Sequence, residues 1–344
     1  MLLPVNPSDD WTTLRIHADD AGQRLDRFLR KLLPGCPLGQ IFKFLRKGRI
    51  RLGSSKARPE LRLVEGQEIC FRMPRDELRS LGWSRADSSR RQPRQGRSPE
   101  AGSDISRVFE DEDILAVDKP AGLPVHGGSG HESDDLGLRV RKALAASSSA
   151  QVSHTFAPGP AHRLDRETSG LLLFGKSARG LRALSALFHD KGIRKSYLAV
   201  IRGEPGVDRG QLSGRFREVV ARRKDRPKLV PDPDGMLVDL EYEVLAARAG
   251  HSLVRVQLGT GKMHQIRAQF AAEGHPLVGD QRYGGGEPGQ EAFAALSPPR
   301  FLLHSERLLF EHPFTSESLD LRVAPPRDLA KLLDRLGLSP CSEE

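Results

Sequence analysis

Two stretches near the start of the chain place apolar residues at intervals of three and four, which is the period of an α-helix. The first, RLDRFLRKLL, ends at Pro34-Gly35 and aligns on one face Leu25, Phe28, Leu29 and Leu32. The second, GQIFKFLRKGRIRL, repeats the pattern up to Gly48 with Ile41, Phe44 and Leu45. LRLVEGQEICFRM then alternates apolar and polar positions about Glu65-Gly66, which predicts two strands joined by a turn. We therefore expect a small α/β module over residues 1–74.

Beyond residue 105 the pattern changes to short apolar runs separated by turns. ISRVFEDEDILAVDKPAG predicts a hairpin, because two apolar runs flank an acidic turn and Lys119-Pro120 ends the second run. LLLFGKS and KSYLAVIRG are typical of buried strands, and LEYEVLAARAGHSLVRVQL is typical of a two-strand hairpin. ARGLRALSALFHDKG predicts an amphipathic helix, and GKMHQIRAQFAAEG a short helix ending at Gly274. Because strands outnumber helices without regular alternation, the expected fold class is α+β, with a mixed, mostly antiparallel sheet and flanking helices.

Residues 75–104 differ in composition from both flanking regions. They hold seven Arg and few apolar side chains, so they bury too little surface to offset the entropy lost on ordering. We expect an Arg-rich flexible linker here, between the module of residues 1–74 and a larger domain over residues 105–344.

The charge of the chain favours a polyanionic partner. Its 344 residues include 54 Lys and Arg against 45 Asp and Glu, a net charge of +9 that attracts phosphate groups. Residues 39–62 hold eight basic residues and one acid, Glu60, and a second basic cluster extends from Arg215 to Lys228. Nucleic acid is the expected partner, with contacts predicted at Lys43, Arg46, Lys47, Arg49, Arg51, Arg222, Arg223, Lys224 and Arg226.

Several other functional classes lack their sequence signals. No GxxxxGK[ST] phosphate loop, strand-linked G-x-G-x-x-G or G-x-S-x-G motif is present. The three cysteines lie far apart and the eleven histidines are scattered, which argues against a disulfide framework and a metal site. The start, MLLPVNPSDD, lacks the pattern of a signal peptide, and no apolar run reaches the length of a membrane span. We expect a cytoplasmic protein without a membrane partner.

One short loop sequence carries the candidate chemistry. AHRLDRETSG places one carboxylate, Asp165, between Arg163 and Arg166 and ends in a Thr-Ser-Gly turn. An aspartate acts as nucleophile or base only where another group keeps it ionised and aimed, and a nearby arginine does both. The stretch GTGKMHQIRAQF offers such an arginine, Arg267.

Four motifs, in this order, resemble those of the RluA family of pseudouridine synthases: VFEDEDILAVDKPAGLPVHGGSG, HRLDRETSG, KSYLAVIRG and TGKMHQIRAQFAAEGHPLVGDQRYG. The resemblance covers most of residues 105–325, and the preceding module resembles the S4 RNA-binding domain found before the catalytic domain in many members. RLDRFL, FLRKGRIRL and VHGGSG are most similar to the RluC type, which modifies 23S ribosomal RNA of the large subunit. The resemblance implies the pseudouridine synthase fold and an isomerisation that needs no cofactor and no metal; we expect a monomer.

The resemblance also implies roles for individual residues. Asp165 corresponds to the catalytic aspartate, which attacks the target nucleotide or removes its 2′ proton, so that the base detaches at N1, turns and reattaches through C5. Tyr197 corresponds to the tyrosine that stacks on the flipped base and handles the C5 proton, and Arg267 to the basic partner of the aspartate. Arg163 is expected to fill the space left by the extruded uridine, which suits a long planar guanidinium. Further substrate contacts are expected from His162, Thr168, His264 and Gln265.

The expected partner is 23S ribosomal RNA or an assembly intermediate of the large subunit, and two alternatives stay open. One keeps the chemistry but moves it to transfer RNA, which the S4-like module argues against. The other is a ribosome-assembly factor that binds RNA without catalysis. The presence of Asp165, Tyr197 and Arg267 argues against this second alternative.

Overall fold

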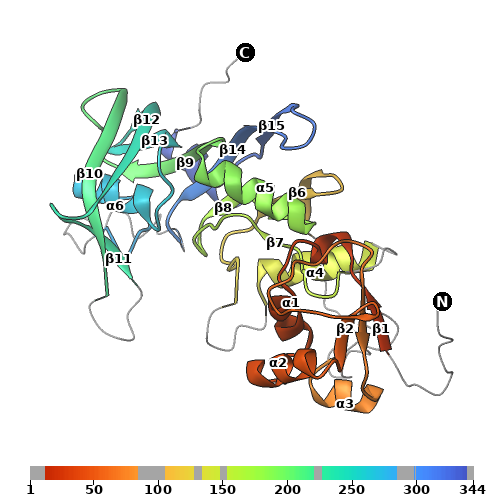
Figure 1. The fold of residues 1–344 in the computed structure, drawn as a ribbon. Coiled ribbons are helices and arrows are strands. Elements are labelled where there is room, and N and C mark those ends of the chain that lie inside the picture. Colours follow the sequence, from red (N-terminus) through yellow and green to blue (C-terminus); the bar gives the residue numbers. More distant parts are fainter. Residues whose placement is uncertain are drawn as a thin grey trace. The chain divides into compact units, whose positions relative to one another are not determined.

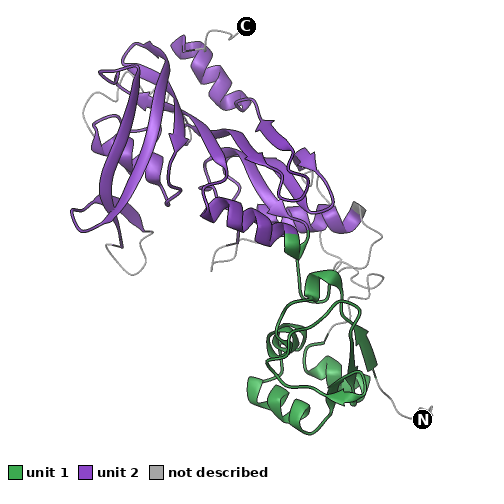
Figure 2. Ribbon diagram, turned by 45° about the horizontal axis from the view of Figure 1, so that its top comes forward, with its two compact units in different colours: residues 1–102, 147–157, 177–179 green, residues 103–146, 158–176, 180–344 purple. Residues whose placement is uncertain are grey.

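The computed structural model describes residues 12–83, 105–127, 134–147, 153–220, 227–284, 298 and 300–338. The chain forms two compact units (Figure 2). Unit 1 comprises residues 1–102, 147–157 and 177–179, and unit 2 comprises residues 103–146, 158–176 and 180–344. None of the helices in the described ranges has the length and apolar character needed to cross a membrane.

Unit 1 contains a four-stranded antiparallel sheet with strand order β1-β4-β2-β3, together with short helices (Figure 1). Its elements are β1 (Thr12–Arg15), η1 (Ala18–Asp20), α1 (Leu25–Leu32), α2 (Leu38–Arg46), β2 (Ile50–Leu52), β3 (Ser55–Lys56), β4 (Glu68–Phe71) and α3 (Arg75–Ser80). The two predicted helices are confirmed, because α1 and α2 bury the apolar stripes that the sequence places on one face of each.

The predicted hairpin around Glu65-Gly66 is wrong in its first half. β4 forms as expected, but the residues before the turn contribute only an isolated bridge between Arg62 and Arg24. The reason is that β1 and β2 occupy both edges of β4. No edge of β4 is left for the segment that precedes it in the sequence.

The predicted linker is wrong over residues 75–83. These residues form α3 and a following turn, which bury Leu78 and Trp83 in the core of unit 1. The Trp83 ring stacks on Phe71 with centroids 5.9 Å apart. Two apolar anchors are enough to order this stretch, although the average composition of residues 75–104 is polar. Residues 84–104 lie outside the described residues.

Unit 2 is built on a mixed, mostly antiparallel sheet of eleven strands among the described residues, in the order β11-β10-β12-β13-β9-β14-β8-β6-β5. β15 pairs with β14, β7 pairs with β8, and the β14–β8 pair is parallel. The strands are β5 (Ser106–Glu110), β6 (Ile114–Lys119), β7 (Gly159–Pro160), β8 (Ser169–Gly175), β9 (Arg194–Arg202), β10 (Arg209–Val219), β11 (Lys228–Pro231), β12 (Met236–Arg248), β13 (His251–Leu258), β14 (Leu303–Glu311) and β15 (Ser318–Arg322). The helices are α4 (Leu136–Ser147), α5 (Ala178–His189), α6 (Gln265–Ala272) and α8 (Arg327–Leu336).

The continuous apolar runs of the central strands are explained by helices on both faces of the sheet. In β9, Tyr197 and Ala199 point into the cluster that contains residues of α4 and α6, whereas Leu198 and Val200 point into the cluster that contains α8. β6 and β8 alternate in the same way between the α4 and α6 face and the face covered by α5. Strands buried on both faces lose the polar alternation of half-exposed strands. The face with α4 and α6 carries the candidate site.

Candidate active site

Asp165 lies in the loop between β7 and β8, and the structure explains why this loop ends in Thr-Ser-Gly. The backbone N–H of Thr168 donates to the Asp165 carbonyl at 3.1 Å, which closes the turn. Gly170 has φ +105°, and a Cβ at this position would lie 2.2 Å from the Ser305 carbonyl oxygen of β14. Only glycine allows β8 to approach β14 this closely. The short pairing of these two strands therefore fixes the start of β8 and the loop that precedes it.

A buried lysine that the sequence analysis missed supports the same loop from the other side. Lys119, at the end of β6, is fully buried, and its Nζ donates to the carbonyls of Pro120, Leu123 and Arg166 at 2.8–3.0 Å. Burial lowers the pKa of Lys119 to about 7, while three carbonyl acceptors favour its charged form. A lysine directly after a buried apolar strand was the available signal. Its ammonium ties the segment after β6 to the residue next to Asp165.

Asp165 and Arg267 form an ion pair. Arg267 Nη1 donates to Asp165 Oδ2 at 3.0 Å, and the two side chains are 7% and 17% exposed. Arg267 belongs to α6, and its guanidinium carbon lies 4.0 Å from the Phe301 ring centroid and 5.1 Å from that of Tyr283. Burial acts against the charge, but hydrogen bonds and the charges of Asp280 and Asp165 raise the pKa of Arg267 overall. The cation that pairs with Asp165 thus lies against two aromatic rings.

His264 lies at the start of α6 in the left-handed conformation, with φ +57°. Its Nε2 is 3.6 Å from Asp165 Oδ2, and its Nδ1 is 3.2 Å from the Tyr283 hydroxyl oxygen. Burial lowers the pKa of His264 to about 4, against the opposing charge of Asp165. The ring is therefore neutral near pH 7, which suits the shaping of a pocket.

Gln265 lines the pocket, but its amide is fully used by the protein. Its Oε1 accepts from Thr260 Oγ1 and the Lys262 backbone N–H, and its Nε2 donates to the Asp239 carbonyl and Gln269 Oε1. An amide offers two donors and two acceptor positions, and all four are occupied. Gln265 therefore fixes the loop before α6, and no hydrogen bond of its amide remains for a substrate.

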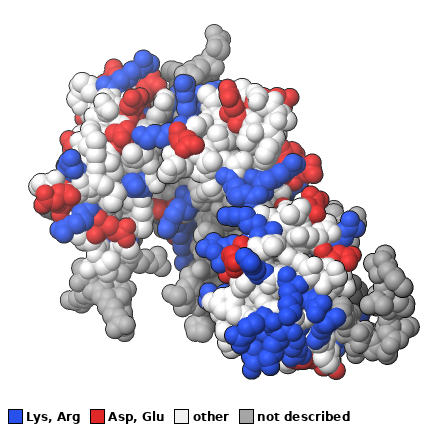
Figure 3. Space-filling view, in the orientation of Figure 1, with Lys and Arg blue, Asp and Glu red and all other residues white. Residues whose placement is uncertain are grey.

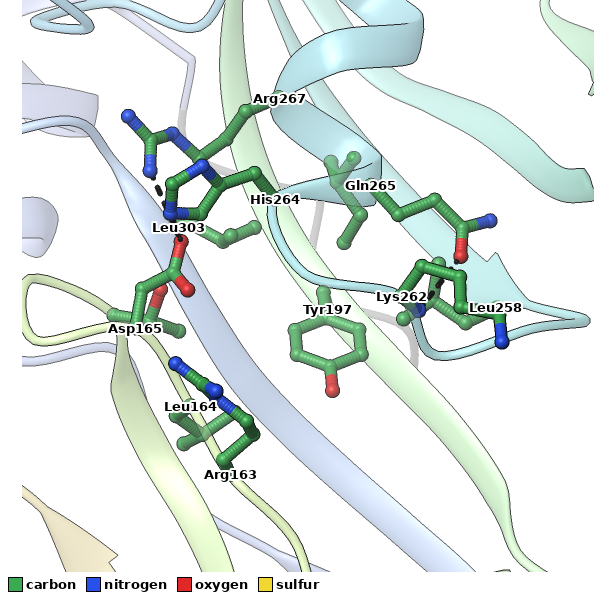
Figure 4. A pocket seen from close by; sticks show the side chains of 12 residues that line it. Arg163, Leu164, Asp165, Tyr197, Leu258, Lys262, His264, Gln265, Arg267 and Leu303 are labelled. Carbon is green, nitrogen blue, oxygen red and sulfur yellow. Dashed lines mark hydrogen bonds and ion pairs between the residues drawn. The ribbon is translucent and has the colours of Figure 1, made fainter. Parts of the chain in front are cut away.

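These side chains meet in one pocket (Figure 4). It is lined by Arg163, Leu164, Asp165, Thr168, Tyr197, Leu258, Lys262, His264, Gln265, Ile266, Arg267 and Leu303. Tyr197 enters from β9, where it is paired with Val256 and Ser305, and it is 6% exposed. Burial raises the pKa of Tyr197 to about 12, so the phenol is protonated at neutral pH. The pocket thus combines the carboxyl group of Asp165, a neutral aromatic ring and basic side chains.

His162 is not among the residues that line this pocket, and its predicted substrate contact stays a prediction. Its Nε2 accepts a hydrogen bond from the Leu173 backbone N–H at 3.0 Å, and its ring lies 4.3 Å from the Phe188 ring. Burial lowers the pKa of His162 to about 3, which matches its role as a neutral acceptor. His162 and Arg163 are neighbours in the sequence, but their side chains have different contacts. His162 contacts β8 and α5, whereas Arg163 lines the pocket.

The basic residues predicted to contact RNA in unit 1 fall into two groups. Lys43, Arg46 and Lys47 are exposed on α2 and directly after it, and Lys and Arg side chains gather on the visible face of unit 1 (Figure 3). Arg49 instead pairs with Glu77 at 2.6 Å and lies over the Phe44 ring. Arg51 donates to the carbonyls of Gly48 and Ser54. The first group is available to a partner, whereas the second also stabilises unit 1.

The second basic cluster lies on and beyond a hairpin of unit 2. β10 and β11 pair antiparallel. Of its flanking charges, Arg217 pairs with Asp232 at 2.7 Å, and Lys228 Nζ lies 5.0 Å from the Tyr283 ring centroid. The predicted contacts Arg222, Arg223, Lys224 and Arg226 lie outside the described residues.

Comparison with known families and proteins relates the chain to one class of RNA-modifying enzyme. Residues 113–272 match the model of the family described as RNA pseudouridylate synthase. The ribosomal large subunit pseudouridine synthase C of Salmonella typhi is 33% identical over 323 residues, which cover 93% of this chain and 95% of the relative. The protein of the same name from Yersinia pestis is 31% identical over 316 residues, covering 92% of each chain. The similarity therefore extends over both units.

Solved structures show a related fold. The human RNA pseudouridylate synthase domain containing 4 superposes with a TM-score of 0.55 at 22% identity, covering 68% of this chain and 94% of that one. The human RNA pseudouridylate synthase domain containing 1 gives a TM-score of 0.52 at 20% identity, with 72% and 100% covered. At these identities the likeness concerns the fold, and it matches the mixed, mostly antiparallel sheet of unit 2.

Proposed function

The chain belongs to the RNA pseudouridylate synthase family and is an RNA pseudouridine synthase, and from this premise we propose that it isomerises specific uridines of large-subunit, 23S ribosomal RNA. This substrate is supported by relatives that carry a large-subunit name and align over nearly the whole chain. It is further supported by the basic surface of unit 1, since exposed lysines and arginines favour contacts with a phosphate backbone.

We propose Asp165 as the group that acts on the nucleotide, and the observation that carries this is its ion pair with Arg267 at the pocket. The carboxylate either attacks the target nucleotide or removes its 2′ proton. The bond between N1 of the base and C1′ of the ribose breaks, the base turns, and C5 bonds to C1′ as the bond to Asp165 breaks or the 2′ proton returns. The C5 proton leaves and N1 takes up a proton. Atoms balance without a co-reactant, so the protein needs to supply only an aimed anion and a cavity for the base.

Tyr197 is proposed to stack on the extruded base. Its ring is neutral because burial raises the pKa of the phenol to about 12. A protonated phenol is a poor acceptor for the C5 proton, so its raised pKa supports the stacking role over proton removal. Stacking of one base on an aromatic ring contributes about 1 to 3 kcal/mol.

Arg163 is proposed to occupy the place that the uridine vacates. Its side chain is exposed at the pocket and makes no ion pair with any side chain in the described ranges. Extruding a base takes a few kcal/mol, roughly the loss of its stacking and pairing, which a planar guanidinium in its place offsets in part. Thr168 lines the same pocket and is proposed as a further substrate contact.

Unit 1 is proposed to be an S4-like RNA-binding domain, with the remainder of the chain as the catalytic domain. Its proposed contacts are the exposed Lys43, Arg46 and Lys47, together with the partly buried Arg49 and Arg51. The basic residues of the segment 222–226 are proposed as further contacts from unit 2. We propose a monomer that acts in the cytoplasm on 23S ribosomal RNA or on an assembly intermediate of the large subunit.

Mapping of pseudouridines in cellular RNA tests the substrate. We expect specific sites in large-subunit ribosomal RNA to disappear when the gene is deleted, to return with the wild-type protein and to stay absent with Asp165→Asn. Loss of sites in transfer RNA alone would replace this substrate with the alternative. If no site in any RNA depends on the protein, the non-catalytic alternative holds.

The basic face of unit 1 is tested by a charge-removal pair with a matched control. Lys43→Ala with Arg46→Ala removes one lysine and one arginine from a single face of α2, and Lys331→Ala with Arg335→Ala does the same on exposed positions of α8. We expect the α2 pair to weaken RNA binding and to reduce the salt slope by roughly 1 to 2, since each lost phosphate contact removes about 0.7 to 0.9. Equal effects of both pairs would contradict a specific contact surface.

A further inference from the structure

A second carboxylate, Asp280, is bound to the guanidinium that pairs with Asp165. Its side chain is fully buried, its Oδ2 accepts from Arg267 Nε at 2.6 Å, and its Oδ1 accepts from Arg267 Nη2 at 3.0 Å. Arg267 Nη1 is the nitrogen that donates to Asp165. Asp280 does not line the pocket. One guanidinium therefore connects a carboxylate at the pocket to a carboxylate outside it.

The orientation of Asp280 is fixed by its own backbone turn. Its Oδ1 also accepts from the backbone N–H groups of Arg282 and Tyr283 at 3.0 and 3.1 Å. Gly279, just before it, has φ +80°, and a Cβ there would lie 2.2 Å from the Arg300 carbonyl oxygen. The stretch GDQRYG, which had no assigned role in the sequence, thus forms a rigid cradle for one carboxylate.

Two parallel hydrogen bonds fix the plane of an arginine in a way that one cannot. Arg267 has a flexible stem, and a single bond to Asp165 would leave the guanidinium free to turn about it. The bidentate bond to Asp280, with Phe301 and Tyr283 against the guanidinium, removes this freedom. Of the three N–H groups that remain, two are on Nη1, and their directions toward Asp165 are fixed.

The charges lead to the same conclusion. Asp280 is ionised, because Arg267 and the two backbone N–H groups lower its pKa in spite of burial. Two carboxylates and one guanidinium give the group a net charge of −1. The carboxylate of Asp280 therefore already compensates the positive charge of the Arg267 guanidinium. It directs the catalytic carboxylate without neutralising it fully.

We propose that Asp280 is a positioning residue of the isomerisation, which aims Arg267 Nη1 at Asp165 and compensates the guanidinium charge so that Asp165 stays reactive. The proposal rests on the proposed function and deepens it. Other charged or titratable groups also face Asp165 and Asp280. They are Lys119 at the end of β6, Arg163 in the Asp165 loop, Tyr197 in β9, Lys262 and His264 before α6, and Arg282 and Tyr283 after Asp280.

The first test uses the free protein and needs no RNA. In ¹⁵N-detected or ¹H–¹⁵N spectra of arginine side chains, assigned with Arg267→Lys, we expect the Arg267 guanidinium of the wild type to be locked and slow to exchange. Asp280→Asn keeps the size of the side chain but offers one acceptor in place of two, so we expect the Nη groups of Arg267 to rotate and exchange. Unchanged Arg267 signals in Asp280→Asn would overturn the proposal.

The control for this variant is Asp111→Asn. Asp111 also accepts two backbone N–H bonds and pairs with a basic side chain, His312, but it lies in the turn between β5 and β6. It therefore reports the effect of losing a structural carboxylate from unit 2. We expect Asp111→Asn to leave both the Arg267 signals and the pH profile of turnover unchanged.

The second test is the rate of tritium release from C5-labelled uridine in large-subunit ribosomal RNA. We expect Asp280→Asn to lower kcat by about 10- to 100-fold with KM within about twofold, because a misdirected group acts on a substrate that still binds. Without the compensating charge, the acid limb of kcat should move to lower pH. A purely structural role would lower the amount of active protein but would leave unchanged the pH at which kcat falls on the acid side.

Asp280→Glu separates aim from charge. It keeps the carboxylate but displaces it by one methylene, so we expect a lower kcat with the acid limb of the wild type. If Asp280→Asn does not fold, this variant and its Arg267 signals carry the test, and a wild-type kcat would overturn the proposal. A wild type that releases no tritium would overturn the proposed function instead, and the spectra of Arg267 would still decide whether Asp280 aims it.

Discussion

Unit 2 contains two clusters of one kind, each made of three Asp and Arg side chains. One cluster has one aspartate and two arginines, and the other has two aspartates and one arginine. On the β14–β15 hairpin, one carboxylate, Asp320, accepts hydrogen bonds from Arg307 and Arg322 at 2.6–3.2 Å. At the pocket, one guanidinium, Arg267, donates to Asp165 and Asp280. The first cluster is 37–64% exposed, whereas the side chains of the second are 0–17% exposed. We call them the surface cluster and the pocket cluster.

The comparison shows that a lowered pKa alone does not mark a functional site. The two arginines lower the pKa of Asp320 to about 2, yet the cluster lies open to water and lines no described pocket. In the pocket cluster, protein groups replace water as the partners of the charges, so their directions are fixed. Water can replace either partner in the surface cluster, but it cannot do so in the pocket cluster.

The largest expected difference comes from removing the arginine. Arg267→Met leaves two carboxylates close together, one of them fully buried, and we expect the free energy of unfolding to fall by about 3 to 5 kcal/mol. Arg307→Met leaves Asp320 with Arg322 and water, and we expect a loss of at most about 1 kcal/mol. Urea unfolding of both variants, followed by circular dichroism, measures the difference. Equal losses would contradict the distinction between the clusters.

The pH dependence of the unfolding free energy also differs between the two clusters, and the expected difference is smaller than that for removing the arginine. A histidine of the unfolded chain protonates near 6.5, whereas folded His264 protonates near a pKa of about 4, so the unfolded state binds more protons between these values. His264 therefore makes the protein less stable as the pH falls from 6.5 to 4. Asp320 has a depressed pKa of about 2 against an ordinary 3.8, so its contribution is lost only as the pH falls from 3.8 to 2.

Thermal unfolding across these two pH ranges checks the assignment. We expect His264→Gln to reduce the loss of stability between pH 6.5 and 4 by roughly 1 to 3 kcal/mol. Asp320→Asn should leave that range unchanged. A His264→Gln protein with the wild-type pH dependence would show that the ring is not held neutral by the pocket.

The smallest expected effect is that of Asp320→Asn at neutral pH. Its carboxylate is partly exposed, and exposed ion pairs contribute about 0 to 1 kcal/mol. We expect the melting temperature to change by a few degrees at most, about 2 to 4 °C per kcal/mol for a domain of this size, with tritium release unchanged. Loss of activity in this variant would mean that the surface cluster takes part in the function.

The fold could be predicted where the signal is local. The stripes of α1 and α2 and the apolar runs of β6, β8 and β9 report burial directly, because each pattern depends only on which sides of its own element are covered. The partners of β4 could not be predicted, since β1 and β2 reach it from distant parts of the sequence. Trp83 was hidden in the same way by the polar composition around it.

In the candidate site, too, residues within a recognisable motif could be predicted, whereas residues whose role depends on the folded backbone could not. Asp165 and Arg267 stand out because each lies in a motif with a family resemblance, and the ion pair joins residues that are 102 positions apart. The surroundings of His162 could not be predicted, because sequence order does not show that its ring accepts a hydrogen bond from the Leu173 backbone N–H. Lys119 and Asp280 were missed because their function depends on carbonyls and N–H groups that only the folded backbone brings to them.

The most direct test of the central claim is tritium release from C5-labelled uridine in large-subunit ribosomal RNA by the wild type and by Asp165→Asn. The central claim is that the carboxylate held by Arg267 carries out the isomerisation. We expect the wild type to release tritium, and Asp165→Asn to bind the same RNA with unchanged affinity while its release falls by about 10⁴-fold or more. Release by Asp165→Asn at the wild-type rate would contradict the account.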